Sequence, residues 1–113
     1  MIYILNTFAV PINFVKHEEA IIKIEKIELE QAKKLLSNNK FVSAVGHEST
    51  ARLLSELFGV HIPTNRIEVS LEEGDISLHF VLLRRLAEGQ ILNYQELAKT
   101  GFNLLLSKVL TVK

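Results

Sequence analysis

The hydrophobic residues of this chain change their spacing several times along its length. Segments in which apolar and polar residues alternate are typical of half-buried strands, whereas apolar residues three and four positions apart are typical of amphipathic helices. The two kinds of segment follow one another here, with glycine, proline or asparagine between them. This order predicts an α/β (α+β) fold in which helices flank a mixed β-sheet of about five strands.

The expected strands are short, and each is bounded by residues that favour turns. They are residues 2–5, 20–27, 41–45, 66–71, 76–83 and 102–112. Residues 66–71 have the most regular alternation, because Ile67, Val69 and Leu71 are separated by polar residues. That segment gives the clearest strand prediction in the chain.

Two helices are expected before the middle of the chain. Helical spacing starts at Leu29 and is broken at Asn38, with acidic residues early and basic residues late, an order that suits the helix dipole. A second helix covers residues 49–58. Gly59 follows it directly and is suited to the left-handed conformation that ends many helices.

Residues 76–83 fit either a strand or the beginning of a helix. Asn93 and Glu96 have the spacing of a capping box, in which the cap residue and the third helical residue bond each other's backbone. The capping box predicts a new helix over residues 94–99. This favours a strand at 76–83 and an exposed loop at 84–92.

The 113 residues are expected to form one small domain, residues 1–113, because the chain has no repeats, low-complexity tracts or linkers. It has no cysteine, which excludes disulfides and thiolate metal sites. Thirteen basic residues balance thirteen acidic ones, so duplex nucleic acid, whose binding needs many phosphate contacts, is not an expected partner. No apolar run approaches the roughly 20 residues that span a bilayer, and no secretory signal opens the chain. We therefore expect no membrane partner and a cytoplasmic location.

The first candidate site is the segment from Ala44 to Thr50, where an expected strand, a glycine and polar residues lead into a helix. Backbone N–H groups at the positive end of a helix bind phosphate. His47 at the rim of such a site could orient a ribose hydroxyl or stabilise a charged phosphorane. The alternative is that Ser49 or Thr50 caps the helix and that His47 is an exposed loop residue.

Charged residues make two further candidates. Arg84, Arg85 and Glu88 fall within or beside one short loop, where guanidinium groups suit phosphate and a glutamate with a raised pKa could protonate a leaving alkoxide. The alternative is a solvated surface with a weak ion pair. Arg66, next to Asn65 at the start of an expected strand, is the other candidate, against the alternative of a solvated side chain.

The loop from Asn6 to Asn13 is the last candidate, because its two amide side chains could read adenine edges or simply form turns. Several familiar sites are absent: the chain has no HExxH zinc motif, no Walker loop, no G-x-G-x-x-G and no G-x-S-x-G. His17, His61 and His79 lack ligand spacing and are interpreted as surface or satisfied histidines. No metal or cofactor is therefore expected.

These motifs occur in an order that resembles the viral and bacterial ring nucleases, which were first described in archaeal viruses and act as type III anti-CRISPR proteins. The matching residues are Gly46-His47-x-Ser49-Thr50, Asn65-Arg66-x-Glu68-Val69, Gly74-Asp75 and Arg85-Leu86-x-Glu88-Gly89. Together they cover most of the chain at compatible spacing. The chain departs from the family pattern at Pro11, where a serine is often found, and at Val81, where some members have a polar residue.

The resemblance implies a homodimer that destroys cyclic tetra-adenylate, a second messenger that switches on defence nucleases, without a metal or other cofactor. The messenger would bind at the dimer interface. The catalytic residues that the resemblance implies are His47, Arg85 and Glu88, with Glu88 as the general acid and Arg85 at the scissile phosphate. The ligand-binding residues that it implies are Asn6, Asn13, Ser49, Thr50 and Arg66.

The implied reaction uses the chemistry of the substrate, because the ribose 2′-hydroxyl attacks its own adjacent phosphate and leaves linear di-adenylates with 2′,3′-cyclic phosphate ends. The residues alone leave two alternatives open. A protein that sequesters a cyclic nucleotide or RNA would use the same helix start and arginines but would not need Glu88. A protein whose sheet serves only assembly would leave the polar motifs on its surface.

Overall fold

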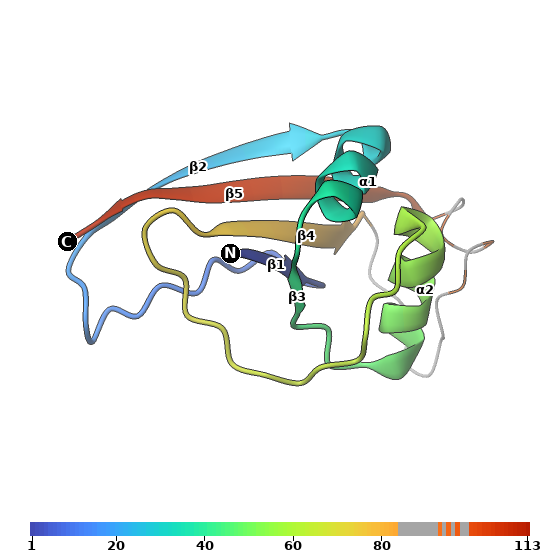
Figure 1. Cartoon of the computed structure of the whole chain (residues 1–113), viewed down its shortest axis with the longest axis horizontal. Helices are drawn as coiled ribbons and strands as arrows, with labels where there is room; N and C mark the ends of the chain where they lie inside the picture. The colour runs from blue at the N-terminus through green and yellow to red at the C-terminus, as the bar shows by residue number, and fades with distance from the viewer. Residues whose placement is uncertain (84–92, 94, 96, 98–99) are drawn as a thin grey trace.

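The computed structural model describes residues 1–83, 93, 95, 97 and 100–113. Within them, five strands form one mixed sheet on which two helices pack (Figure 1). In chain order the elements are β1 (Ile2–Leu5), β2 (Ala20–Ile27), α1 (Leu29–Asn38), β3 (Val42–Ser43), α2 (Glu48–Phe58), β4 (Ile76–Leu82) and β5 (Phe102–Val112). The predicted fold class is confirmed. No helix in this described part is long and apolar enough to cross a membrane.

The sheet has the strand order β2-β5-β4-β1-β3. β1 pairs in parallel with β3 on one side and with β4 on the other, so that Ile4 lies opposite both Ser43 and Leu78. β5 pairs antiparallel with β4 and β2. Because β1, β3 and β4 run in one direction, their carboxyl ends point toward the same edge of the sheet.

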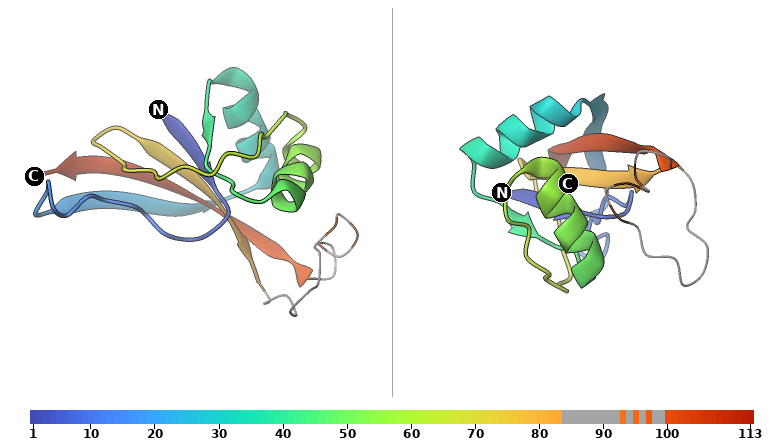
Figure 2. Two further views of the ribbon diagram at one scale, coloured as in Figure 1. Left: turned by 90° about the horizontal axis from the view of Figure 1, so that it is seen from below. Right: turned by 90° about the vertical axis from the view of Figure 1, so that its right-hand side faces the viewer.

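Both helices cover the same face of the sheet, and the hydrophobic core lies between them and the strands (Figure 2). Leu78 and Phe80 of β4 face this core together with Leu54 of α2. Since side chains alternate along a strand, Ser77 and His79 face the opposite side. The segment that follows β1 crosses that side (Figure 2).

The helix ends follow the sequence signals closely. Gly59 has a φ of 70°, and its amide donates to the Ser55 carbonyl, as expected of a left-handed cap after α2. At the start of α1, the Glu28 amide donates to Gln31 Oε1 over 2.8 Å. That bond satisfies a backbone group at the helix start that has no partner within the helix.

The prediction of a strand at 66–71 is wrong. The segment joins no ladder of the sheet, and the Leu71 amide donates instead to the Pro11 carbonyl over 2.9 Å. Leu71 is completely buried, whereas Ile67 is 43% exposed. Alternation of apolar and polar residues does not make a strand by itself, because a strand also needs a partner along its length, and within the described residues β3 is the last strand at that side of the sheet.

The strand expected at 41–45 is shorter than predicted, since only Val42 and Ser43 form β3. The strand expected at 76–83 is confirmed as β4. The expected helix at 94–99 is described only in part. Gln95, Leu97 and Thr100 are helical, and the Leu97 amide donates to the Asn93 carbonyl over 3.0 Å. The loop expected at 84–92 lies outside the described residues.

Candidate functional site

Two of the candidate segments follow neighbouring parallel strands and therefore lie at one edge of the sheet. The loop that begins at Asn6 follows β1, and the turn that contains Gly46 and His47 follows β3, the partner of β1. In open sheets with parallel strands, ligands bind outside the carboxyl ends of those strands. The topology thus brings together candidate residues that are far apart in the sequence.

The side chain of Arg66 lies against the backbone at Gly46. Its Nη2 donates a hydrogen bond to the Gly46 carbonyl over 3.3 Å. A Cβ added to Gly46 would stand 3.4 Å from Arg66 Nε, so the Arg66 side chain lies in van der Waals reach of this glycine. The structure therefore joins two motifs, Gly46-His47 and Asn65-Arg66, that the sequence shows only as separate segments.

Hydrogen bonds around Ser43 hold this junction together. The Ser43 hydroxyl donates to the Pro63 carbonyl over 2.6 Å and accepts a bond from the Val45 amide over 3.3 Å. Asn65 donates from its side chain to the Ser43 carbonyl and from its amide to the Val45 carbonyl, both over 2.8 Å. Ser43 is only 2% exposed. These shielded bonds fix the residue before Arg66 against the turn that follows β3.

His47 is the N-cap residue of α2, which begins at Glu48. The His47 backbone is extended, its carbonyl accepts a bond from the Ala51 amide over 2.9 Å, and its side chain makes no capping hydrogen bond. The alternative in which Ser49 or Thr50 caps the helix is therefore wrong. The imidazole and the Ser49 side chain are exposed, beside first-turn N–H groups that have no partner within the helix.

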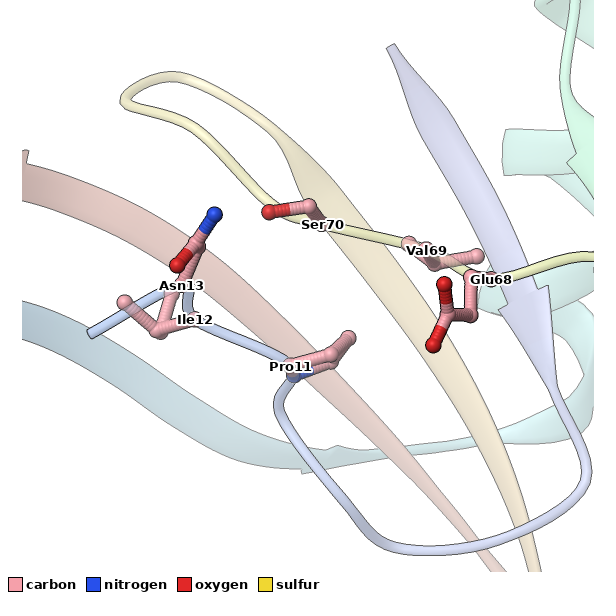
Figure 3. Close-up of a pocket in the computed structure, with 6 residues that line it drawn as sticks. All are labelled: Pro11, Ile12, Asn13, Glu68, Val69 and Ser70. Carbon is pink, nitrogen blue, oxygen red and sulfur yellow. The ribbon is translucent and has the colours of Figure 1, made fainter. Parts of the chain in front are cut away.

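A cavity of about 400 Å³ lies between the loop after β1 and the segment 68–70 (Figure 3). Its lining residues are Pro11, Ile12, Asn13, Glu68, Val69 and Ser70. Asn13 Oδ1 accepts bonds from the amides of Val15 (3.0 Å) and Lys16 (3.3 Å), so Asn13 does form a turn. Its amide nitrogen points toward Ser70 in Figure 3 and could still meet a ligand. Asn6 is half-buried directly after β1.

Three predicted residues cannot be placed relative to this edge. Arg84, Arg85 and Glu88 lie outside the described residues. They follow β4 in the sequence, which is the third parallel strand. The assignment of Arg85 and Glu88 to the site therefore remains a prediction from the resemblance, which gives Arg84 no role.

A buried polar network on the face opposite the helices was not predicted. His79 is 0% exposed; its Nδ1 lies 2.8 Å from the Thr7 carbonyl and its Nε2 lies 2.7 Å from the Ser77 hydroxyl. The Ser77 hydroxyl also bonds the Ser107 hydroxyl. Polar residues at alternate positions of β4 are the signal that could have revealed a polar stripe on this face.

His17, which lies between β1 and β2, is paired with the carboxylate of Glu72. His17 Nε2 lies 2.8 Å from Glu72 Oε2, and Lys16 Nζ lies 3.2 Å from Glu72 Oε1. The hydrogen bond from His17 and then the one from Lys16 lower the pKa of Glu72. Among the described residues, no three histidine, aspartate or glutamate side chains gather in a group that could hold a metal ion.

Comparison with known proteins relates the chain to proteins of archaeal viruses. A family model described as STIV B116-like matches residues 2–104. Protein 26 of Sulfolobus islandicus filamentous virus is 43% identical over 112 residues, which cover 98% of this chain and 93% of that protein. The ORF117 protein of Acidianus two-tailed virus is 45% identical over 107 residues, which cover 92% of this chain and 89% of that protein.

A solved structure has the same fold. B116 of Sulfolobus turreted icosahedral virus superposes with a TM-score of 0.73 at 27% identity. The superposition covers 95% of this chain and 97% of that chain. The similarity therefore extends over nearly the whole length of both chains.

The two hydrogen bonds of the Ser43 hydroxyl, to the Pro63 carbonyl and the Val45 amide, lead to a first prediction. Ser43→Ala is expected to lower the free energy of unfolding by about 1–3 kcal/mol, because it leaves a shielded carbonyl and amide without their hydroxyl partner. Urea unfolding followed by circular dichroism measures the change. Ser37→Ala, which removes an exposed hydroxyl bonded to the Lys34 carbonyl, is the control, with an expected change within about 0.5 kcal/mol. Equally small changes in both variants would show that these bonds do not hold the turn.

The buried imidazole makes a second prediction. Burial lowers the pKa of His79, and the hydrogen bond to the Thr7 carbonyl opposes that shift. In the unfolded chain the histidine pKa is about 6.5. Between that pKa and the lower pKa of the folded state, the unfolded chain binds more protons than the folded chain. The free energy of unfolding therefore falls as the pH drops below the pKa of the unfolded chain. Urea unfolding should show this decline from about pH 7 to about pH 5, and His79→Asn should reduce it. An equal decline in both proteins would assign it to other groups.

Proposed function

The chain belongs to the STIV B116-like family, and we propose that it is a metal-independent ring nuclease that cleaves cyclic tetra-adenylate. The observation that carries the proposal is the junction at the sheet edge, where Arg66 bonds the Gly46 carbonyl next to the N-cap residue His47. The junction combines a guanidinium, an imidazole and helix N–H groups. These are groups that bind phosphodiesters.

In the proposed reaction the nucleophile belongs to the substrate. The ribose 2′-oxygen forms a bond to the adjacent phosphorus, and the bond from phosphorus to the 5′-oxygen breaks. The 2′-hydroxyl gives its proton to His47 or to a water molecule during the attack, and Glu88 gives a proton to the departing 5′-oxygen. Arg85 orients the phosphate, and His47 stabilises the phosphorane charge or assists the hydroxyl. In-line positioning supplies a large part of the acceleration, and preorganised cations add to it.

Two copies of the chain would act together on one ring. A twofold axis presents every site twice, and a ring of four equal nucleotides centred on that axis meets both copies. Cleavage at opposite phosphates then yields two equal di-adenylates with 2′,3′-cyclic phosphate ends. Such an enzyme would work in the cytoplasm of the infected cell and switch off type III CRISPR signalling.

Sequestration without cleavage is the second candidate function. The junction at Arg66 and the cavity beside Asn13 could hold phosphate and adenine without a proton donor. Glu88, which cleavage needs and sequestration does not, lies outside the described residues. The two functions are therefore distinguished by the products formed rather than by binding.

The direct test incubates the protein with labelled cyclic tetra-adenylate in excess chelator. We expect linear di-adenylates with cyclic phosphate ends, because the proposed chemistry uses no metal. The matching ring of 2′-deoxyadenylates is the control, since it should bind but stay intact. Retention of the uncut ribose ring would identify sequestration, and a protein that neither binds nor cuts it would contradict both functions.

A second test separates the proposed catalytic groups from the fold. His47→Ala is expected to slow cleavage at least about 100-fold with binding largely intact, the range for loss of one catalytic group. Glu88→Gln should also slow turnover. His61→Ala and Glu56→Gln, which change exposed residues elsewhere on the surface, are the matched controls and should cleave at the natural rate. Full activity of His47→Ala would remove His47 from the mechanism.

A further inference from the structure

The loop after β1, which carries Asn6 and Asn13, is held against the sheet at Thr7 and Phe8. His79 Nδ1 lies 2.8 Å from the Thr7 carbonyl, and the imidazole packs against the Phe8 ring with centroids 5.4 Å apart. His79 is completely buried, whereas Phe8 is 47% exposed. A single side chain of β4 therefore contacts two consecutive residues of the loop.

The hydrogen bonds around His79 have one consistent direction. The Thr7 carbonyl can only accept, so Nδ1 carries the hydrogen and Nε2 presents a lone pair. The Ser77 hydroxyl, 2.7 Å from Nε2, is nearer to it than Ser107 Oγ at 3.4 Å; if Ser77 donates to Nε2, the Ser107 hydroxyl donates to the Ser77 oxygen. Every donor in this series points toward the loop. The neutral imidazole is thereby fixed in one tautomer and one orientation.

The loop is fixed a second time before it reaches Asn13. The Pro11 carbonyl accepts the bond from the Leu71 amide over 2.9 Å, and Leu71 is completely buried. Asn6 lies just before the anchor at Thr7, and Asn13 lies just after the anchor at Pro11. The two anchors therefore determine where both asparagines stand, and the first of them depends on a side chain that substitution can remove.

We infer that His79 is a positioning residue that holds this loop in the conformation that receives the nucleotide ring. The inference rests on the proposed function and deepens it. His79 acts through Thr7 and Phe8 and touches no substrate. If the anchor is lost, the loop occupies other conformations, and the apparent dissociation constant rises as the binding-competent fraction falls. Turnover at saturation should persist, because Arg66 and His47 are held by separate bonds.

Two substitutions separate the hydrogen bond from the bulk of the ring. His79→Leu removes the donor, whereas His79→Asn keeps a donor close to the position of Nδ1. We expect KM for cyclic tetra-adenylate to rise about tenfold or more in His79→Leu, with kcat at saturation changed less than about threefold, and most of the loss to be recovered in His79→Asn. Equal KM values in His79→Leu and the natural protein would overturn the inference.

A control addresses general destabilisation. Leu36→Ala removes a buried side chain of α1, which lowers stability without touching the loop. Its KM should stay near that of the natural protein at a temperature where both are folded. A rise in KM equal to that of His79→Leu would show that His79 acts only through stability. Phe8→Leu tests the same anchor from its exposed side, should a buried substitution prevent folding, and should also raise KM.

Hydrogen exchange tests the anchor without any ligand. The amides of Ile12 and Leu71, which donate to the Val10 and Pro11 carbonyls of the loop, should exchange faster in His79→Leu than in the natural protein or in Leu36→Ala. Unchanged exchange there would overturn the role of His79. A natural protein that neither binds nor cleaves the ring would instead overturn the proposed function, so the two failures are distinguishable.

Discussion

The parallel pairing of β1 with both β3 and β4 is the constraint on which the rest of the structure depends. It places the carboxyl ends of three strands at one edge, and the loop after β1 and the turn after β3 both start there. An antiparallel β3 would carry Gly46 and His47 to the opposite edge, away from Asn6. The chemistry of the candidate site thus follows from strand direction before any side chain is considered.

Most of the elements could be predicted from the sequence, because periodicity and end signals are local properties. α1, α2 and the long strands β2, β4 and β5 lie where their patterns indicate, and Gly59 ends α2 as expected. The prediction of a strand at 66–71 failed because alternation is a property of one segment and does not show whether a second strand lies beside it. β3 is the outermost strand on that side of the sheet and has only two paired residues, which are too few to hold a sixth strand.

The candidate site was predictable in its parts and not in its assembly. The order of motifs that resembles the ring nucleases selected His47 and Arg66, but the bond from Arg66 to the Gly46 carbonyl is a long-range contact that no local pattern contains. His79 was interpreted as a surface or satisfied histidine and is satisfied, but the sequence does not show which groups it bonds, because a histidine between apolar residues has many uses. Its partners depend on the pairing of β4 with β5 and on the path of the loop across the face opposite the helices.

The place of β5 in the sheet bears on how the chain folds as it leaves the ribosome. Within the described part of the chain, β2 pairs with β5 and with no other strand, and β5 is the last of the five strands to be made. At ordinary rates of translation, the stretch between Ile27 and Phe102 takes roughly 4–15 seconds to synthesise. During that delay residues 20–27 lack the strand with which they pair in the sheet, and charged side chains such as Lys23, Glu25 and Lys26 are of the kind that disfavours pairing with other chains.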